Sequence, residues 1–526
     1  MQTRRLLPLL ICAALVAVGC SEDAGSKAKG GKRAPAASTS PCTPGKGEKT
    51  AKVLLRCAAG SVAYVSNPMS TGTGVVVEEA GKRYVLTNLH VVDPFDSADV
   101  TFGSTTLRRV PVVGVDANAD ITLLGPLDDD DRAPIPLGGD SDVESGDDVY
   151  LVGYPGESGG TNTSKPKDLE ATIARGIVSR TRKVDEFEQR FIQTDASISG
   201  GQSGGPLFDD RGRLVGISGL SFADEFALAL VTSDVRESIA RILDGKGHDY
   251  LALPLRPEGG DGSGTLRIAD SEDGQLLYLP PADEDRTLRL SVSGDDTVVS
   301  VSSLVEGAPL AVSSNSLRIY QEVENRVAAR RGGTPESLPD AAAMGLDAKV
   351  QAREVAPGRF EVPIAADDGA VVYVERPLAD APGEVTWSSD LPLLQVTSER
   401  FTAAIQLDEP LDHVFTAFDD YVELTLDLEE GERIEVHARS ATGDTGFDLI
   451  APSVTLDAVT RADREVDGIE NVDDTDDGIY GVDARKVLTA TETGTYRIHW
   501  YTNDGVTEMA RISVRKCSSS SCRDPE

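Results

Sequence analysis

The sequence predicts an all-β protein made of several β domains. Between residues 61 and 232, twelve short apolar runs alternate with turn residues, and no long helical pattern separates them. After residue 246 the composition shifts to Asp, Gly, Val, Thr and Pro, again with alternating polar and apolar residues. At 526 residues the chain is too long for a single hydrophobic core. We therefore expect two β barrels followed by further β domains.

The twelve runs form two groups of six, separated by an acidic loop at residues 127–132. Two such groups are typical of two packed barrels. A helix is expected after them, with Asp234 as its cap, Glu237 completing a capping box and Gly245 at its end. The predicted strands are Ser61–Val65, Gly74–Glu78, Tyr84–Thr87, Val100–Phe102, Val110–Val115, Ile121–Leu124, Asp148–Gly153, Thr172–Ser179, Arg190–Thr194, Gly205–Phe208, Leu214–Ser218 and Ala227–Thr232.

The chain divides into five predicted parts. Residues 1–20 are a signal peptide, 21–41 a flexible tether rich in Ser, Ala, Gly and Lys, and 42–245 the double barrel. Residues 246–400 are a β-rich domain of unknown type, with one helix at residues 321–331. Residues 401–526 contain strands and glycine turns at Tyr421–Leu426, Gly431–His437, Asp444–Leu449 and Glu492–Ile498. This succession resembles the β-sandwich accessory domains that are appended to secreted bacterial peptidases, and such domains usually help to bind substrate or a surface.

The first twenty residues are typical of an export signal. Arg4 and Arg5 precede an apolar stretch that is too short for a permanent membrane span. It ends in Ala17-Val18-Gly19-Cys20, which resembles a bacterial lipobox, although Ala17 departs from the large aliphatic residue preferred there. The resemblance implies a cell-envelope lipoprotein, periplasmic or at the cell surface, anchored to the membrane through a lipid on Cys20. Ordinary signal cleavage and a retained anchor remain as alternatives.

The cysteines indicate the redox compartment of the protein, and the net charge indicates which partners it can bind. Apart from Cys12 and Cys20, four Cys remain, and they allow three pairings. The local pairing, Cys42–Cys57 and Cys517–Cys522, needs the least chain closure and suits an oxidising compartment. The formal net charge of −36 argues against a nucleic-acid partner, because phosphates would be repelled.

The strongest chemical pattern is the glycine-rich segment from Thr194 to Pro206, which contains Gly201-Gln-Ser203-Gly-Gly. A hydroxyl nucleophile needs backbone N–H groups aimed at the oxyanion that forms when it attacks a carbonyl. Glycines on both sides of Ser203 let the chain turn tightly enough to present them. We therefore expect Ser203 to be the nucleophile, with the amides of Gly201 and Ser203 as the oxyanion hole.

A His and an Asp complete the constellation. His90 follows an apolar strand and is the only His before His248, and Asp120 stands at the mouth of another strand. His90 is the expected general base, and Asp120 the anion that fixes its tautomer, with Asp116 as the fallback. Base and anion fall on the first predicted barrel and the nucleophile on the second, so the site should lie between the barrels.

These motifs resemble the trypsin-like serine peptidase superfamily, and its HtrA/Deg branch most closely. The resemblance covers about residues 55–245 and implies a chymotrypsin-like double six-stranded barrel, peptide-bond hydrolysis through an acyl-enzyme, a protein or peptide substrate, and no cofactor. Gln202 stands where the branch usually has Asn, and the loop typical of a PDZ domain is not found after Gly245. The motifs are Gly72–Val75, Thr87–Val92, Asp120–Leu124, Val152–Pro155, Arg175–Ser179, Thr194–Ala196, Gly201–Pro206 and Gly212–Gly216.

The sequence also gives expectations for the specificity pocket and for metal binding. The predicted peptidase region has no second His and no Asp in Ser197–Gly200, so we expect a specificity pocket for small or aliphatic residues. The acidic run Asp473–Gly478 lacks the final Glu of a calcium loop, having Ala484 there, and we predict no metal site. The oligomeric state is left open. The alternative function is a catalytically inactive surface lipoprotein that uses the peptidase fold and the β-sandwich domains for binding or adhesion.

Overall fold

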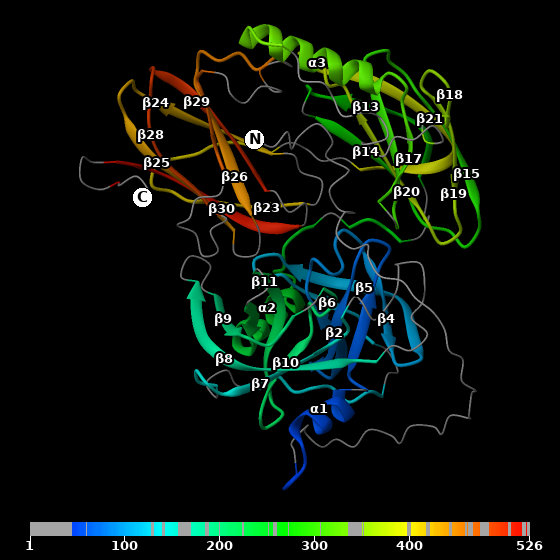
Figure 1. Cartoon of the computed structure of the whole chain (residues 1–526), viewed down its shortest axis with the longest axis vertical. Coiled ribbons are helices and arrows are strands. Elements are labelled where there is room, and N and C mark those ends of the chain that lie inside the picture. The colour runs from blue at the N-terminus through cyan, green and yellow to red at the C-terminus, as the bar shows by residue number, and fades with distance from the viewer. Residues whose placement is uncertain are drawn as a thin grey trace.

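The computed structural model shows three β-rich parts that follow one another along the chain (Figure 1). No helix of the part it describes has the length and apolarity needed to cross a membrane. The structure describes residues 45–517 and Cys522, with gaps at 59, 128–130, 139–142, 156–169, 185–188, 199, 223–225, 251, 256–259, 272, 306, 335–349, 351, 397–400, 417–420, 441–443, 458–459, 461–466, 474–482, 503–506 and 518–521.

The first part consists of two closed six-stranded barrels, so the predicted chymotrypsin-like all-β fold is confirmed. The strand orders are β1-β2-β3-β6-β5-β4 and β10-β11-β12-β9-β8-β7. Each of the twelve predicted runs forms a strand. The strands are β1 (Val62–Ser66), β2 (Thr71–Glu79), β3 (Lys82–Thr87), β4 (Ser97–Phe102), β5 (Thr105–Asp116), β6 (Ile121–Leu124), β7 (Asp148–Gly153), β8 (Thr172–Val184), β9 (Gln189–Thr194), β10 (Pro206–Asp209), β11 (Leu214–Phe222) and β12 (Phe226–Val231).

Apolar side chains alternate between the two faces of these strands. One face fills the interior of each barrel, and the other contributes to a core that the two barrels share. Val65, Val76 and Val85 fill the first barrel, while residues such as Leu151 and Leu207 fill the second. The opposite faces of the same strands meet in a third cluster to which both barrels contribute. Because this shared cluster holds the barrels together, loops at the junction keep a fixed relation to one another.

Two helices accompany the barrels. Helix α1 (Thr50–Ala58), which the sequence analysis did not predict, buries Val53 and Leu54. Helix α2 (Thr232–Leu243) begins three residues earlier than expected, and the predicted capping box is wrong because Val231, not Asp234, occupies the cap position. The carboxylate of Asp234 instead accepts hydrogen bonds from the backbone N and Nη2 of Arg190 on β9 (2.6 and 2.7 Å). A tertiary ion pair has replaced the local cap.

The middle part is a nine-stranded sheet folded over one core, with helix α3 (Ser316–Arg331) beside it. Strand β21 pairs with β13 and β15 along its first half and with β14 at its end, so it belongs to both halves of the fold. The strands are β13 (Asp261–Ile268), β14 (Gly274–Leu279), β15 (Arg286–Val292), β16 (Val298–Ser303), β17 (Pro309–Val312), β18 (Glu354–Ala356), β19 (Arg359–Ile364), β20 (Ala370–Glu375) and β21 (Gly383–Val396).

The last part is a β-sandwich, as predicted. A five-stranded sheet (β22-β24-β29-β26-β27) and a four-stranded sheet (β23-β30-β25-β28) enclose one core around Trp500 and Phe447. The strands are β22 (Thr402–Ala404), β23 (Leu411–Phe415), β24 (Val422–Leu428), β25 (Arg433–Ser440), β26 (Thr445–Ile450), β27 (Ile469–Val472), β28 (Ala484–Thr489), β29 (Gly494–Thr502) and β30 (Glu508–Lys516).

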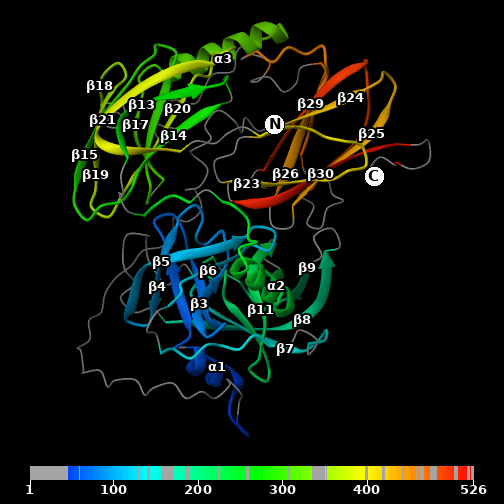
Figure 2. The ribbon, with the colours of Figure 1, turned by 180° about the vertical axis from the view of Figure 1, so that it is seen from behind.

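The three parts are in direct contact. In both ribbon views the middle domain and the sandwich lie side by side above the double barrel, with β23 and β30 of the sandwich on the side of α2 (Figures 1 and 2). Arg330 of α3 reaches across to Asp457 of the sandwich (2.9 Å). Phe95 of the double barrel is buried among Leu276 and Tyr278 of the middle domain.

Candidate active site

His90 and Asp120 are joined by two hydrogen bonds. Nδ1 of His90 lies 2.7 Å from Oδ2 of Asp120, and the backbone N of His90 donates to Oδ1 of the same carboxylate (3.0 Å). The Asp carboxylate is almost buried, with 10% of its side chain exposed, whereas 29% of the His90 side chain is exposed. With Nδ1–H donating to Asp120, the neutral ring keeps its lone pair on Nε2, the nitrogen that a general base uses.

The backbone around Asp120 is held in an uncommon conformation. Its φ of +51° lies in the left-handed region, which Asp adopts more readily than most residues. The Asp120 carbonyl accepts hydrogen bonds from Nδ2 of Asn88 (2.9 Å) and from the backbone N of Leu89 (3.1 Å). Strand β6, which begins at the next residue, and the loop before His90 thus fix the carboxylate from both sides.

The electrostatic surroundings favour a protonated His90 more than water does. Burial lowers the pKa of His90, but the carboxylate of Asp120, by charge and by hydrogen bond, and that of Asp93 raise it by more. The net pKa of His90 therefore lies above its ordinary value of 6.5. An imidazole with a raised pKa is a stronger base, and its cation is stabilised when it takes a proton.

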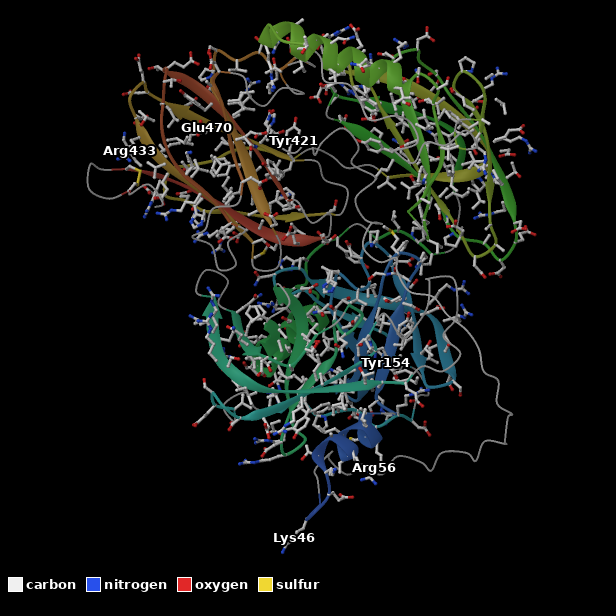
Figure 3. All side chains as sticks on the ribbon, in the orientation of Figure 1. Lys46, Arg56, Tyr154, Tyr421, Arg433 and Glu470 are labelled. Atoms are coloured by element: carbon white, nitrogen blue, oxygen red, sulfur yellow. A yellow bond between two sulfur atoms is a disulfide. The ribbon has the colours of Figure 1, made fainter. Side chains whose placement is uncertain are left out.

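The Ser203 loop is fastened to the first barrel through Thr73 of β2. The backbone N of Thr73 donates to the carbonyl of Ser203, and its Oγ1 donates to the carbonyl of Gly201 (both 2.8 Å). The same Oγ1 accepts a hydrogen bond from the backbone N of Tyr154 on the second barrel (3.0 Å). Thr73 is fully buried, so these bonds are shielded from water. Figure 3 shows Tyr154 within the double barrel.

Two glycines let the loop lie this close. A Cβ on Gly72 would stand 2.5 Å from the methyl groups of Val91 and 3.1 Å from the Ser203 carbonyl. Because Gly72 has no side chain, Val91, the residue after His90, and Ser203 can both lie against its backbone. Gly204 has a φ of +81°, and a Cβ there would lie 2.1 Å from the Thr73 carbonyl. The structure thus brings the His90 loop and the Ser203 loop to the same end of β2.

Two backbone amides of the Ser203 loop, those of Gly201 and Ser203, have no acceptor among the residues that the structure describes. The carbonyl of Gln202 accepts from Oγ of Ser218 (2.7 Å) and from the backbone N of Gly205 (3.0 Å). Because a trans peptide directs its N–H opposite to its carbonyl, the N–H of Ser203 points to the other side of the loop. Within the described part of the chain, neither this amide nor that of Gly201 donates to an acceptor.

Asp116, the fallback partner for His90, lies in a different network. Its carboxylate binds the guanidinium of Arg241 on α2 (Nε, 3.0 Å) and lies 3.4 Å from Nδ1 of His248. The hydrogen bonds of His90 go to Asp120 instead. Asp116 therefore ties α2 and the segment after it to the end of β5.

Other predicted site residues take structural positions. Asp195 accepts a hydrogen bond from the backbone N of Ile177 on β8 (2.7 Å). Gln202 is buried, and its Nε2 contacts Oγ1 of Thr172 (3.3 Å). The predicted Cys517–Cys522 disulfide is present. Cys57 is also disulfide-bonded, whereas Cys42 and the proposed lipidation residue Cys20 lie outside the described residues.

The acidic run predicted to lack a metal is described only up to its first residue, Asp473. Elsewhere in the described part of the chain, no group of three His, Cys, Asp or Glu side chains is arranged to hold a metal ion.

Sequence reasoning missed a second carboxylate beside the His–Asp pair. Asp93 is buried, with 6% of its surface exposed, and it contributes to the electrostatics of His90. Both of its oxygens accept hydrogen bonds from Thr507 of the sandwich. The only local signal was an acidic residue three positions after His90. Nothing in the sequence near Asp93 pointed to a partner 414 residues away.

Comparison with known proteins agrees with this geometry. Residues 72–217, which contain His90, Asp120 and Ser203, match the family described as "Trypsin-like peptidase domain". With its two closed barrels and this match, the segment is similar to trypsin-like peptidase domains in fold and in sequence.

Among curated relatives, "Serine protease Do-like HtrA" of Bacillus subtilis (strain 168) is 33% identical over 229 residues, which are 40% of this chain and 49% of the relative. "Probable periplasmic serine endoprotease DegP-like" of Brucella suis biovar 1 (strain 1330) is 29% identical over 248 residues, 44% of this chain and 45% of the relative. The chain thus spans about half the length of the curated relatives it matches.

Solved structures of HtrA-type proteases also align with part of the chain. "HtrA-type protease AlgW with tripeptide" is 28% identical with a TM-score of 0.32, and the match covers 37% of this chain and 64% of that one. "Crystal structure of the serine endoprotease from Yersinia pestis" is 29% identical with a TM-score of 0.31, and covers 36% and 65%.

Proposed function

We propose that this protein is a serine endopeptidase that hydrolyses peptide bonds through an acyl-enzyme at Ser203. The observation that carries the proposal is the doubly hydrogen-bonded His90–Asp120 pair, which lies at the end of β2 where Thr73 holds the Ser203 loop. The trypsin-like family match and the serine protease relatives support the same chemistry.

In the proposed mechanism, Oγ of Ser203 attacks the carbonyl carbon of the scissile peptide bond while Nε2 of His90 takes its proton. The carbonyl oxygen becomes an oxyanion and accepts hydrogen bonds from the N–H groups of Gly201 and Ser203. His90 then gives the proton to the leaving amine, and the C–N bond breaks to leave an ester on Ser203. Water attacks this ester with His90 again as base, and Ser203 recovers its proton.

Asp120 orients His90 throughout this cycle. Its two hydrogen bonds to His90 hold the ring and the backbone at once, and its charge stabilises the imidazolium that forms in each half-reaction. Every group that this mechanism requires belongs to the chain itself, so the proposed chemistry needs no cofactor.

We further propose that the protein is exported and anchored by a lipid on Cys20. The basic and apolar segments of residues 1–20 support export, as does a DegP-like relative described as periplasmic. The Cys517–Cys522 disulfide suits an oxidising compartment. Mass spectrometry of the mature N-terminus tests the anchor: a diacylglycerol-modified Cys20 is expected, and an unmodified N-terminus at another residue would contradict it.

The proposed pocket preference is for small or aliphatic residues. Asp195 supports it, because its carboxylate is committed to the backbone of β8 and is therefore not a pocket anion for Arg or Lys. Cleavage of a peptide library mainly after Arg, Lys or Glu would contradict this preference.

A fluorophosphonate probe tests the proposed nucleophile directly, because it reacts with an activated serine without requiring a known substrate. The wild type is expected to be labelled at Ser203, and the Ser203→Ala variant to remain unlabelled. Absence of Ser203-dependent labelling in folded wild-type protein would favour the alternative, a peptidase fold kept for binding. Peptide mapping of the labelled residue distinguishes reaction at Ser203 from reaction at another serine.

A further inference from the structure

The loop that carries His90 is where the three parts of the molecule meet. In this segment, residues 89–96 and here called the His90 loop, Phe95 is fully buried against Leu253, Leu276 and Tyr278. Leu89, the residue before His90, lies in a cluster with Val414 and Met509 of the sandwich. Both C-terminal domains therefore pack on the few residues that position the proposed base.

The linker after α2 holds the same loop by hydrogen bonds. The hydroxyl of Tyr250 donates to the carbonyl of Phe95 (2.9 Å). The backbone N of Leu253 donates to the carbonyl of Pro94 (2.7 Å), and its carbonyl accepts from the N of Asp96 (3.0 Å). The far end of the His90 loop is thus fixed by the linker and the middle domain, while its near end is fixed by the pairing with Asp120.

Between these two ends, the sandwich holds Asp93 with one residue. The backbone N of Thr507 donates to Oδ2 of Asp93 (3.0 Å), and Oγ1 of Thr507 donates to Oδ1 (2.7 Å). Both residues are buried, with 6% and 4% of their surfaces exposed. A carboxylate that accepts two short hydrogen bonds away from water is fixed in position and orientation. The next residue, Glu508, points elsewhere, because its carboxylate accepts a hydrogen bond from Ser440 within the sandwich.

We propose that Thr507 is a positioning residue for catalysis, which fixes the His90 loop through Asp93 and makes the C-terminal sandwich part of the active site. The inference rests on the proposed function, because its effect is on the reaction of Ser203. It assigns the sandwich a role beyond substrate or surface binding: without Thr507, the carboxylate of Asp93 loses two hydrogen-bond donors. The backbone before it keeps the hydrogen bonds from Nδ2 of Asn67 to the carbonyls of Val91 and Val92 (3.0 and 3.1 Å), so the loss is felt at the Asp93 side chain. A 1 Å displacement of a catalytic group is enough to cost about a hundredfold in rate.

The charges around Asp93 connect it with His90. Burial raises the pKa of Asp93 to about 6, the two bonds from Thr507 act in the opposite direction, and among nearby charges Asp120 raises it while His90 lowers it. The phenol of Tyr250 faces the same carboxylate from the linker, and burial together with the charges of Asp93 and Asp96 raises its pKa. Thr507 therefore favours the ionised form of Asp93, whose charge in turn favours protonated His90.

The rate of fluorophosphonate labelling in the full chain tests this role. Thr507→Val removes the hydroxyl donor while keeping the shape of the side chain, and Thr507→Ser keeps the donor. Asp93→Asn replaces one acceptor oxygen by an amide NH2 group, which cannot accept a hydrogen bond from Thr507. Thr445→Val is the matched control, because Thr445 is fully buried in the same sandwich. Among the described residues, its hydroxyl donates to the carbonyl of Tyr501 and accepts from Nε1 of Trp500 (both 2.9 Å), and neither partner belongs to the His90 loop.

We expect Thr507→Val and Asp93→Asn to be labelled about tenfold more slowly than the wild type, because His90 is less well placed. Thr507→Ser should stay within about twofold of wild type, since the hydrogen bond to Asp93 is retained. Thr445→Val should keep the wild-type rate even if its unfolding temperature falls. In Thr507→Val and Asp93→Asn, the pH midpoint of labelling should also move to lower pH, because His90 loses a stabilising negative charge.

A merely structural contact gives a different result. Wild-type labelling rates and pH midpoints in folded Thr507→Val and Asp93→Asn would overturn the inference, as would an equal loss of rate in Thr445→Val. Thermal unfolding shows which variants are folded, and if Thr507→Val is not, Asp93→Asn decides the comparison. Wild-type protein that is folded and unlabelled would instead overturn the proposed function itself, so the two failures are distinguishable.

Discussion

At the scale of single residues, the site depends on which aspartate carboxylate binds His90. Asp120 and Asp116 lie four positions apart, yet Asp120 binds His90 at two atoms whereas Asp116 binds Arg241 and lies 3.4 Å from His248. Position relative to β6 decides between them, because the left-handed backbone at Asp120 turns its side chain toward the His90 loop. The two aspartates therefore form a matched pair for mutagenesis.

Asp120→Asn should lower the labelling rate of Ser203 by roughly 10³-fold or more, because an amide can no longer hold the required tautomer of His90 or stabilise its cation. Asp116→Asn should leave the rate within about threefold of wild type and lower the unfolding temperature instead, since it weakens an ion pair with α2. The measurements are probe kinetics and calorimetry of both variants. Equal rate losses would contradict the assignment of Asp120.

The pH dependence of labelling should follow His90. The reaction needs neutral His90, so the rate should fall on the acid side with a midpoint above 6.5, because the pKa of His90 is raised by Asp120. In Asp120→Asn the residual activity should show a midpoint at lower pH, because the charge that favours the protonated ring is gone. Rates measured from about pH 5 to pH 9 locate this midpoint. An unchanged midpoint in the variant would contradict the pairing.

At the scale of elements, strand β2 is the support that joins the two barrels at the site. Thr73 binds the Ser203 loop by its backbone and its hydroxyl, and it also binds Tyr154 at the end of β7. The positive φ of Gly204 and the absence of a side chain on Gly72 allow the loop to approach this strand. Strand β2 thereby sets where the proposed nucleophile lies relative to His90.

Thr73→Val should slow labelling of Ser203 by about tenfold to a hundredfold, because it leaves the carbonyl of Gly201 and the amide of Tyr154 without their buried partner. Thr101→Val is the matched control: Thr101 lies on β4, and its hydroxyl is hydrogen-bonded to that of Thr106 at an exposed position (3.0 Å). That variant should keep the wild-type rate. Probe kinetics on both proteins measure the labelling rates, and calorimetry shows whether they are folded. A folded Thr73→Val that is labelled at the wild-type rate would contradict the role of β2.

The helices and strands show which features of the fold could be predicted from the sequence. Alternation and turn residues predicted all twelve barrel strands, because those signals are local. The order of His90, Asp120 and Ser203 also predicted which barrel carries each of them. Asp234, in contrast, has an ideal local capping pattern but binds Arg190, a residue 44 positions away. Helix α1 was missed because nine residues carry little periodic signal.

At the scale of the whole molecule, the C-terminal domains pack on the double barrel instead of merely following it. Phe95 is buried in a cluster with Leu276 and Tyr278 of the middle domain, and Asp93 is held by the sandwich. Such contacts between residues hundreds of positions apart leave no local pattern, so the sequence could not predict them. They place a buried carboxyl of raised pKa at the junction of two domains.

This carboxyl should make stability depend on pH. The folded-state pKa of Asp93 is about 6, above its ordinary value of 3.8, so the stability it gives is complete below about 3.8 and is lost as pH rises through about 6. Asp93→Asn cannot ionise. The unfolding temperature of this variant minus that of the wild type should therefore rise from about pH 4 to about pH 6 and then level off. A difference that stays constant in calorimetry over this range would contradict the burial of a titrating Asp93.

The central claim is that Ser203 makes this protein a peptidase, and cleavage of a defined peptide library followed by mass spectrometry tests it most directly. The full-length wild type should cut internal peptide bonds, mainly after small or aliphatic residues, and folded Ser203→Ala should cut none. Cleavage that persists in Ser203→Ala, or a folded and probe-reactive wild type that cuts no peptide, would contradict the account.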